Sequence, residues 1–229
     1  MATIVSFVNT KGGVGKSFLS VHLAVWLFDK GQRVALIDAD DQQTSARWLL
    51  GVADHAVEVI ALKAVSEDRR SDELRRLIND LSGKTDFVIV DTKGNAGLST
   101  SAAVIKSDVA CVPLQASAAD LWPIENALST IRLSQEARAG LPKSYLILNQ
   151  TSDSDVVARQ VRSQAEQFGV PIAQTNVKRL HAYRNAPGLR IVATRLLDRK
   201  GRDAAARLDD LFQEIIGAEL SHSGRMAHG

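Results

Sequence analysis

The chain has 229 residues, of which 45% are hydrophobic, and a formal net charge of +2 at pH 7. This length and apolar content suffice for one α/β domain with a well-buried core. The single cysteine, Cys111, excludes an internal disulfide and argues against an iron–sulfur cluster, which needs several thiolates. We expect a cytoplasmic protein without a signal peptide, because the first three residues run straight into a predicted strand. We expect no membrane span, because no apolar stretch approaches 18 residues.

The first predicted elements are a strand, a glycine-rich turn and a helix. An apolar run at residues 4–8 precedes Lys11-Gly-Gly-Val-Gly-Lys16-Ser17, and an amphipathic stretch follows at 18–28. Such a turn directs backbone N–H groups and the positive end of a helix dipole at one point, which favours phosphate. Lys16 adds a charge for the β- and γ-phosphates, and Ser17 offers a hydroxyl to Mg²⁺. The alternative is a flexible turn with incidental lysines. The predicted nucleotide contacts are Gly12, Gly13, Val14, Gly15, Lys16, Ser17 and Phe18.

Acidic residues follow the next two predicted strands. The run at 34–37 ends in Asp38 and Asp40, and the run at 87–90 ends in Asp91. Ligands of open parallel sheets lie beyond the carboxyl ends of the strands, where carboxylates can hold Mg²⁺ or orient water. Any one of these acids could instead cap a helix or form an Asx turn. Together, behind a phosphate loop, they indicate metal and water handling.

The rest of the chain alternates between strand and helix patterns. Strands are predicted near residues 3–9, 34–38, 57–61, 87–91, 109–114, 145–149 and 190–193. Apolar residues recur at helical spacing over 74–81, 157–168 and 208–216. This order predicts a doubly wound, mostly parallel sheet flanked by helices. We expect a single domain over residues 1–220 and a disordered tail at 221–229.

These motifs resemble the ParA/MinD family of deviant Walker A ATPases, and its ParA branch in particular. Lys11 matches the family's signature lysine, and residues 38–42 resemble its D-x-D-P-Q segment. Residues 112–115 and 120–121 resemble its P-x-Q-P-S-x-x-D-L segment, and residues 146–150 its strand ending in an adenine-reading asparagine, here Asn149. The resemblance covers residues 2–216 and implies the P-loop NTPase fold. The loop starts by residue 10, so we expect the short type without an amino-terminal DNA-reading domain.

Two positions depart from the family pattern. The family's proline after the second aspartate is Asp41 here, and its D-T-P-P-G switch reads Asp91-Thr-Lys93-Gly-Asn95. Losing proline loosens a loop, because proline fixes φ. Lys93 either assists ATP binding or holds the switch in a state that couples poorly to hydrolysis. Nucleotide binding is expected in both cases.

A basic stretch lies near the carboxyl end. From Asn176 to Arg207 there are nine basic residues and two acidic ones. This composition suits non-specific binding to a phosphate backbone, although a solvated basic surface is the alternative. The candidate DNA contacts are Lys178, Arg179, Arg184, Arg190 and Arg195. The helix pattern at 208–216 has an acidic polar face, which argues against the membrane helix of the MinD branch.

The resemblance implies a mechanism with ATP and Mg²⁺ as cofactors. Two ATP-bound subunits would pair, with Lys11 reaching the partner's phosphates, while Lys16 holds those of its own subunit. Ser17, Asp38 and Asp91 would serve Mg²⁺, and Asp40 would position the attacking water. The ATP-bound homodimer would bind double-stranded DNA non-specifically on the nucleoid. A ParB-like or other cargo adaptor would trigger hydrolysis and release, which would segregate a plasmid, chromosome or protein cargo.

Three other functions are weighed against this mechanism. The altered segment from Asp91 to Asn95 is compatible with a dimerisation switch that hydrolyses ATP very slowly or not at all. A metabolic P-loop ligase would need a second substrate pocket, for which no acid or histidine cluster is evident. A tyrosine autokinase would need a terminal tyrosine cluster, whereas Tyr145 and Tyr183 are the only tyrosines.

Overall fold

The computed structural model describes residues 1–63, 66–95, 97–115, 124–151, 156–178, 183, 186–188, 190–196 and 198–226. Its centre is a seven-stranded sheet in the order β3-β2-β4-β1-β5-β6-β7. The strands are β1 (Thr3–Phe7), β2 (Val34–Asp38), β3 (Glu58–Ala61), β4 (Phe87–Asp91), β5 (Val109–Gln115), β6 (Lys143–Thr151) and β7 (Val177–Lys178). Every pairing between these strands is parallel, which confirms the predicted doubly wound sheet.

The central strands are buried along their whole length. All five residues of β2 and all five of β4 are buried, because helices cover both faces of the sheet. Their bounds agree with the predicted strands at 34–38 and 87–91. Register pairs Phe7 of β1 with Asp91 of β4, and Asp38 of β2 with Asp91 on the other side. The carboxyl ends of these three strands therefore lie at one edge of the sheet.

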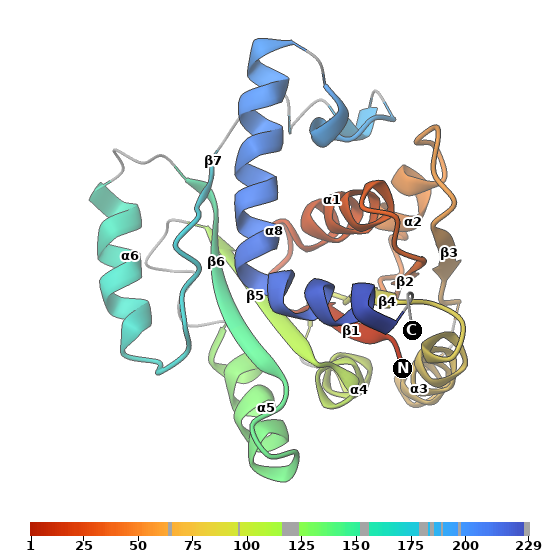
Figure 1. The fold of residues 1–229 in the computed structure, drawn as a ribbon. Coiled ribbons are helices and arrows are strands. Elements are labelled where there is room, and N and C mark those ends of the chain that lie inside the picture. Colours follow the sequence, from red (N-terminus) through yellow and green to blue (C-terminus); the bar gives the residue numbers. More distant parts are fainter. Residues whose placement is uncertain are drawn as a thin grey trace.

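Helices form a layer on each side of the sheet (Figure 1). They are α1 (Lys16–Asp29), α2 (Thr44–Leu49), α3 (Glu67–Ser82), α4 (Leu98–Lys106), α5 (Ile124–Ala137), α6 (Val156–Glu166) and α8 (Arg199–Met226). One core joins α1, α2 and α8 to the sheet, and includes Phe7, Leu23 and Phe212. Two further cores lie under α3 and α4, and under α5 and α6.

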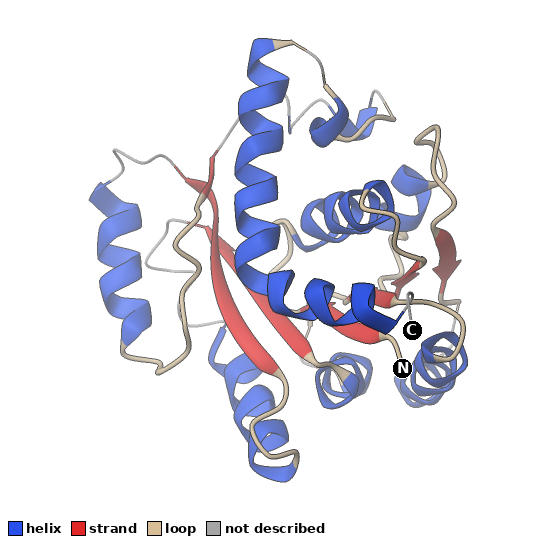
Figure 2. Cartoon of the chain, viewed as in Figure 1, coloured by secondary structure: helices blue, strands red, loops and turns tan. Residues whose placement is uncertain are grey.

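Helix α8 is attached through both its apolar and its acidic residues. Leu208, Leu211, Phe212, Ile215 and Ile216 are buried, as their spacing predicted. Asp209 accepts a hydrogen bond from Trp26 Nε1 at 2.7 Å and pairs with Lys30 at 3.1 Å. Glu214 accepts hydrogen bonds from the backbone N–H groups of residues 174 and 175 at 2.6 and 3.1 Å. Part of the acidic face of α8 therefore makes contacts within the protein. Figure 2 shows that the helix bends toward its carboxyl end.

Two predictions near the carboxyl end are wrong. No strand forms at 190–193; Ala193 instead begins the 3₁₀ helix η2 (Ala193–Arg195). Its backbone N–H donates to Nε2 of buried His22 at 2.9 Å, so this segment packs on α1 and not at the sheet edge. The last strand is the two-residue β7. Residues 221–226, predicted as a disordered tail, continue α8, whereas 227–229 lie outside the described residues.

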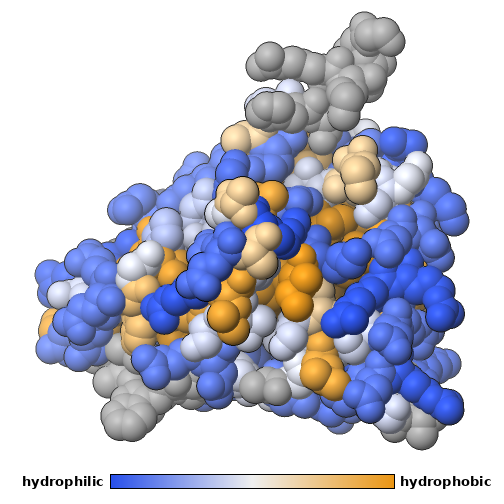
Figure 3. Space-filling view, turned by 90° about the horizontal axis from the view of Figure 1, so that it is seen from below, coloured by the Kyte–Doolittle hydropathy of each residue, from blue (hydrophilic) through white to orange (hydrophobic). Residues whose placement is uncertain are grey.

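The described helices include none that is long and apolar enough to cross a membrane. Figure 3 shows one face of the molecule, where apolar side chains form patches separated by hydrophilic ones.

Candidate nucleotide site

The phosphate loop connects β1 to α1 and depends on Gly15. Gly15 is the N-cap of α1, with a φ of 102°, in the left-handed region that favours glycine. A Cβ atom at Gly15 would lie 1.9 Å from Nδ2 of Asn149, which is a direct clash. The first backbone N–H groups of α1 have no partner within the helix and lie next to this loop. The loop therefore has the geometry of an anion site at a helix N-terminus.

Three polar side chains hold the loop in shape. Asn9 is buried; its Oδ1 accepts from the Lys11 N–H at 2.8 Å, and its Nδ2 donates to Pro113 O at 2.7 Å. Gln115, at the end of β5, donates to Gly13 O at 2.9 Å. Asn149 of β6 donates to the Val14 carbonyl oxygen at 2.7 Å. These bonds fix the loop backbone before any ligand binds.

Asn149 is 2% exposed in this arrangement. Its Oδ1 accepts from the Gln150 N–H at 3.0 Å. The structure therefore gives Asn149 a role in supporting the phosphate loop, and its predicted contact with adenine stays a prediction.

Lys16 is buried at the centre of the loop, with 7% of its surface exposed. Its Nζ donates to the carbonyl oxygens of Asn9 at 3.2 Å and Lys11 at 3.1 Å. Burial lowers the pKa of Lys16, while Asp91 and Asp40 act in the opposite direction. The ammonium group is thus held by two backbone oxygens and lies in the field of two of the predicted acids. The Lys11 side chain is only partly buried.

Asp38 organises the segment that follows β2. It is fully buried, and its Oδ2 accepts hydrogen bonds from the Ser45 hydroxyl at 2.7 Å and the Ala46 N–H at 2.9 Å. Its Oδ1 accepts from the Asp40 N–H at 3.0 Å. Burial raises the pKa of Asp38 and these hydrogen bonds oppose it. Asp38 therefore has a structural role, because it holds the backbone of Asp40, in addition to the metal-binding role predicted from the sequence.

Asp91 is the most unusual carboxylate of the site. It is 1% exposed, and neither carboxylate oxygen has a hydrogen-bond partner among the described residues. Burial, followed by the nearby charge of Asp38, raises the pKa of Asp91 to about 7; the neighbouring hydroxyl groups of Ser17 and Ser45 and the charge of Lys16 act against this rise. A buried carboxylate without partners costs free energy unless a cation or water satisfies it. Hydrated Mg²⁺ held by Ser17 and nucleotide phosphates fits this requirement.

The described side chains do not form a metal site by themselves. Within the described ranges, no group of three or more His, Cys, Asp or Glu side chains is arranged to hold a metal ion. The donor set thus fits a cation bound through a hydroxyl, phosphates and water.

Phe18 packs its ring into an aromatic cluster on α1. The centroid of the Phe18 ring lies 4.2 Å from the ring centroid of His22, 4.9 Å from that of Tyr183 and 6.2 Å from that of Trp48. Its partly buried side chain packs against the core, and its backbone N–H lies at the start of α1, where a phosphate would bind. His22 hydrogen-bonds Phe18 O at 2.8 Å; burial lowers the pKa of His22 to about 4, which keeps it neutral.

The three candidate DNA contacts that the structure describes lie against different elements. Lys178 is partly exposed in β7 and lines a groove together with Asp203 and Arg207 of α8. Arg190 is exposed, and its side chain lies against Gly51, which follows α2. Arg179 and Arg184 lie outside the described residues.

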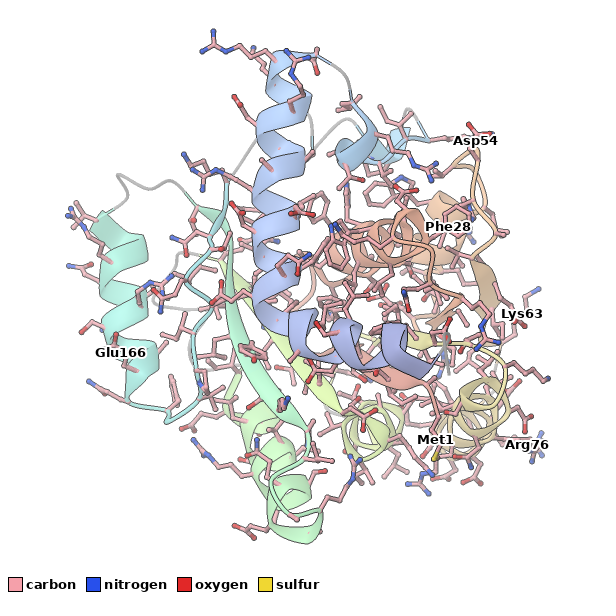
Figure 4. The ribbon with its side chains drawn as sticks, viewed as in Figure 1. Met1, Phe28, Asp54, Lys63, Arg76 and Glu166 are labelled. Carbon is pink, nitrogen blue, oxygen red and sulfur yellow. The ribbon has the colours of Figure 1, made fainter. Side chains whose placement is uncertain are left out.

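Arg195 is used inside the molecule. Its guanidinium pairs with Asp29 at 2.6 Å and donates to the carbonyl oxygens of Ala53 and Asp54 at 2.7 and 2.9 Å. Asp54 lies at the loop that follows α2, facing the segment before α8 (Figure 4). These bonds tie η2 to α1 and to this loop, so Arg195 is a structural residue in this state.

Sequence reasoning missed Asn9, Gln115 and Arg70. The first two hold the phosphate loop, and Arg70 of α3 donates to Ala39 O at 3.0 Å, beside Asp40. Asn9 directly precedes the loop, and Gln115 falls within the matched P-x-Q segment, so both positions carried a signal. Arg70 carried none, because its partners are about 30 positions away.

The fold and the site define a P-loop nucleotide-binding protein. A family model described as the CobQ/CobB/MinD/ParA nucleotide binding domain matches residues 5–189, and the chain belongs to this family. The resemblance inferred from the motifs is thereby confirmed.

The chain is similar to curated relatives of this family. The chain is 31% identical over 218 residues to the Maintenance of carboxysome distribution protein A of Halothiobacillus neapolitanus, covering 94% of this chain and 97% of that protein. It is 27% identical over 171 residues to the Sporulation initiation inhibitor protein Soj of Bacillus subtilis, covering 59% of this chain and 67% of Soj.

Solved structures agree on the fold. Apo McdA of Cyanothece superposes with a TM-score of 0.74 at 16% identity, covering 95% of this chain and 99% of that one. The septum site-determining protein MinD of Pyrococcus horikoshii, complexed with Mg-ADP, gives 0.68 at 20% identity, covering 96% of this chain and 99% of that one. The predicted fold class is thus confirmed by both sheet order and superposition.

Proposed function

We propose that this protein is an ATP-dependent positioning ATPase, acting in the cytoplasm through a single domain over residues 1–220. The observation that carries the nucleotide part is Asp91, a buried carboxylate whose oxygens make no regular hydrogen bond within the described part of the chain, beside Lys16 and a pre-shaped phosphate loop. The positioning part is supported by family membership and by the carboxysome-distribution relative, which matches nearly the whole chain.

Each site residue has a defined task in this proposal. The loop N–H groups and Lys16 bind the phosphates of ATP, and Ser17 provides the oxygen ligand for Mg²⁺. Asp38 and Asp91 orient the water molecules around that ion. Mg²⁺ supplies charge neutralisation at the phosphates. Asn149 keeps the loop in shape and also lies at the strand end where the adenine would be read.

Hydrolysis in this proposal depends on Asp40 and on a second subunit. Asp40 orients the attacking water, because its loop lies at the carboxyl end of β2 next to Asp38. Lys11, only partly buried at the mouth of the loop, reaches the phosphates of the partner subunit and stabilises the charge that develops there. ATP binding, dimerisation and hydrolysis are thereby coupled.

The ATP-bound dimer binds double-stranded DNA on the nucleoid without sequence preference. Lys178 and Arg190 remain candidate contacts among the described residues, because Lys178 is partly exposed and Arg190 is exposed, whereas Arg195 is held by Asp29 and two carbonyls. Arg179 and Arg184 remain candidates from the basic stretch. A ParB-like or cargo-specific adaptor triggers hydrolysis and release.

The decisive test is retention of random-sequence DNA by the purified protein. It is measured without nucleotide and with ADP, ATP or a non-hydrolysable ATP analogue, across a salt series. We expect retention only with the triphosphates, with a Kd of about 10⁻⁴ to 10⁻⁶ M at physiological salt and a steep salt dependence. Equal retention in all four states, or none, contradicts the proposal.

A non-hydrolysing dimerisation switch is the second candidate, favoured by the lysine at position 93 and its ion pair with Asp41. Here DNA retained with ATP would stay bound as long as DNA retained with the analogue. Retention that decays with ATP alone would exclude this candidate.

A further inference from the structure

One buried arginine contacts the residues on both sides of Asp40. Arg70 of α3 is 4% exposed, and its Nη1 donates to the carbonyl oxygen of Ala39 at 3.0 Å. Its Nη2 forms an ion pair with the carboxylate of Asp41. Asp40 therefore stands between two residues held by the same guanidinium.

The other oxygen of Asp41 binds Lys93. The Lys93 Nζ lies 2.6 Å from Asp41 Oδ2, although the two residues are 52 positions apart. Both residues occupy positions where the family pattern has proline. The two departures from that pattern are thus in contact, and the ion pair connects the segment after β2 to the segment after β4.

The segment after β4 in turn lies against the phosphate loop. A Cβ atom built on Gly94 would be 3.3 Å from the Gly12 nitrogen and 3.4 Å from Lys16 Nζ. On the outer side, Glu67 lies 3.6 Å from Arg70 Nε and accepts a hydrogen bond from the Ser99 N–H at 3.0 Å. The contacts therefore run from α3 and α4, through Arg70, Asp41 and Lys93, to the edge of the phosphate loop.

The charges of this group support one another. The hydrogen bond from Lys93, followed by that from Arg70, lowers the pKa of Asp41, so the carboxylate stays ionised. An exposed ion pair alone contributes little, but a pair joined to a buried guanidinium with a second backbone contact restricts the loop more strongly. The restriction replaces the one that two prolines would give through φ.

We propose that Arg70, Asp41 and Lys93 form a clamp that fixes the Asp40 loop against the phosphate loop, and that they are positioning residues for Asp40. The proposal rests on the proposed ATPase function. It assigns Lys93 to Asp41 and not to the γ-phosphate, and so decides between the two roles that the sequence leaves open for this lysine.

The first test compares steady-state ATP hydrolysis, with DNA present, of the wild type with Asp41→Asn and Lys93→Met. Misplacing a group that orients water costs up to about 100-fold in rate, so we expect kcat to fall at least about tenfold with KM for ATP little changed. The double variant should be no slower than the slower single variant, because both substitutions open the same contact. Lys93→Arg should restore most of kcat.

Lys143→Met is the matched control. Lys143 also lies 2.6 Å from a carboxylate, that of Glu219, but far from the loop, and its loss should leave kcat unchanged. The clamp is overturned if Lys93→Met leaves kcat at the control's value. It is also overturned if KM rises while kcat stays constant, since that result would assign Lys93 to nucleotide binding.

Hydrogen exchange provides a readout that does not depend on turnover. Amides of residues 39–43 should exchange at least about tenfold faster in Asp41→Asn and Lys93→Met than in the wild type or Lys143→Met. If the wild type binds ATP without hydrolysing it, the proposed ATPase function fails, and the exchange rates alone decide the clamp. Unchanged exchange at 39–43 would then overturn it.

Discussion

At the scale of single residues, Gly15 is constrained by both its backbone and its neighbour. Its φ of 102° disfavours any side chain, and a Cβ would lie 1.9 Å from Asn149 Nδ2. We expect Gly15→Ala to weaken ATP binding by about tenfold or more, since relieving such strain must distort the loop. Titration with a fluorescent ATP analogue measures this.

Gly31→Ala serves as the control for that variant. Gly31 has a φ of 80° but nothing within 4 Å of its Cβ position, and it follows α1 at the other end from the loop. It should lose some stability while keeping the wild-type Kd for ATP. Equal Kd values in all three proteins would contradict the role given to Gly15.

The buried His22 predicts a pH dependence of stability. Its pKa falls from the ordinary value of 6.5 to about 4, because burial disfavours the charged form. The unfolded chain therefore binds the proton first, and stability present above pH 6.5 is lost as the pH falls toward 4. The loss from this group amounts to at most about 3 kcal/mol.

Urea denaturation from pH 7.5 to 4.5 checks this prediction. His22→Asn should be less stable than the wild type at pH 7.5, because the substitution weakens the hydrogen bond that the Ala193 N–H donates to His22. Its stability should then decline less steeply on acidification. Parallel pH profiles for the two proteins would show that His22 does not carry the effect.

The phosphate loop and the three acids were predictable because their chemistry is local in the sequence. Glycines next to lysine and acids after apolar runs lie within a few positions of one another. The bonds from Arg70 to Asp41 and from Lys93 to Asp41 join residues 29 and 52 positions apart. No short-range pattern records such contacts, so the clamp required the folded chain.

At the scale of elements, Asp209 links α8 to α1. It accepts a hydrogen bond from Trp26 Nε1, whose residue is only 5% exposed, and pairs with Lys30. Asp209→Ala should lower the free energy of unfolding by about 1–2 kcal/mol, because a mostly buried donor loses its acceptor. The neighbouring exposed Asp210 gives the control, and Asp210→Ala should change stability by less than about 0.5 kcal/mol. Equal losses measured by urea denaturation would contradict this assignment.

Element predictions succeeded where burial alone sets the pattern. Strands β2 and β4 are covered on both faces, so they read as unbroken apolar runs and their bounds were predicted. The strand predicted at 190–193 was wrong because the apolar residues there are buried by packing on α1, where the Ala193 N–H bonds His22, and not by pairing in the sheet. Strand β7 has two residues at the sheet edge, too few for any period to be visible.

At the scale of the whole molecule, the proposal requires two subunits. Lys11→Ala should still bind ATP but should stay monomeric with a non-hydrolysable analogue, since its side chain would no longer reach the partner's phosphates. Asp40→Ala should accumulate the ATP-bound dimer. Sedimentation velocity measures both, with Lys143→Met expected to behave as the wild type. Unchanged dimerisation of Lys11→Ala would contradict the role in trans.

The position of β1 has a consequence for synthesis of the chain. Its two neighbours in the sheet are β4, at Phe87–Asp91, and β5, at Val109–Gln115. When β1 leaves the ribosome, neither partner has yet been translated, and closing such distant pairs is slow. We therefore expect the nascent chain to hold an unpaired, strongly apolar strand until residues beyond 91 have emerged, and one open edge of that strand until residues beyond 115 have emerged. The segment that binds phosphate is made early but takes its shape late.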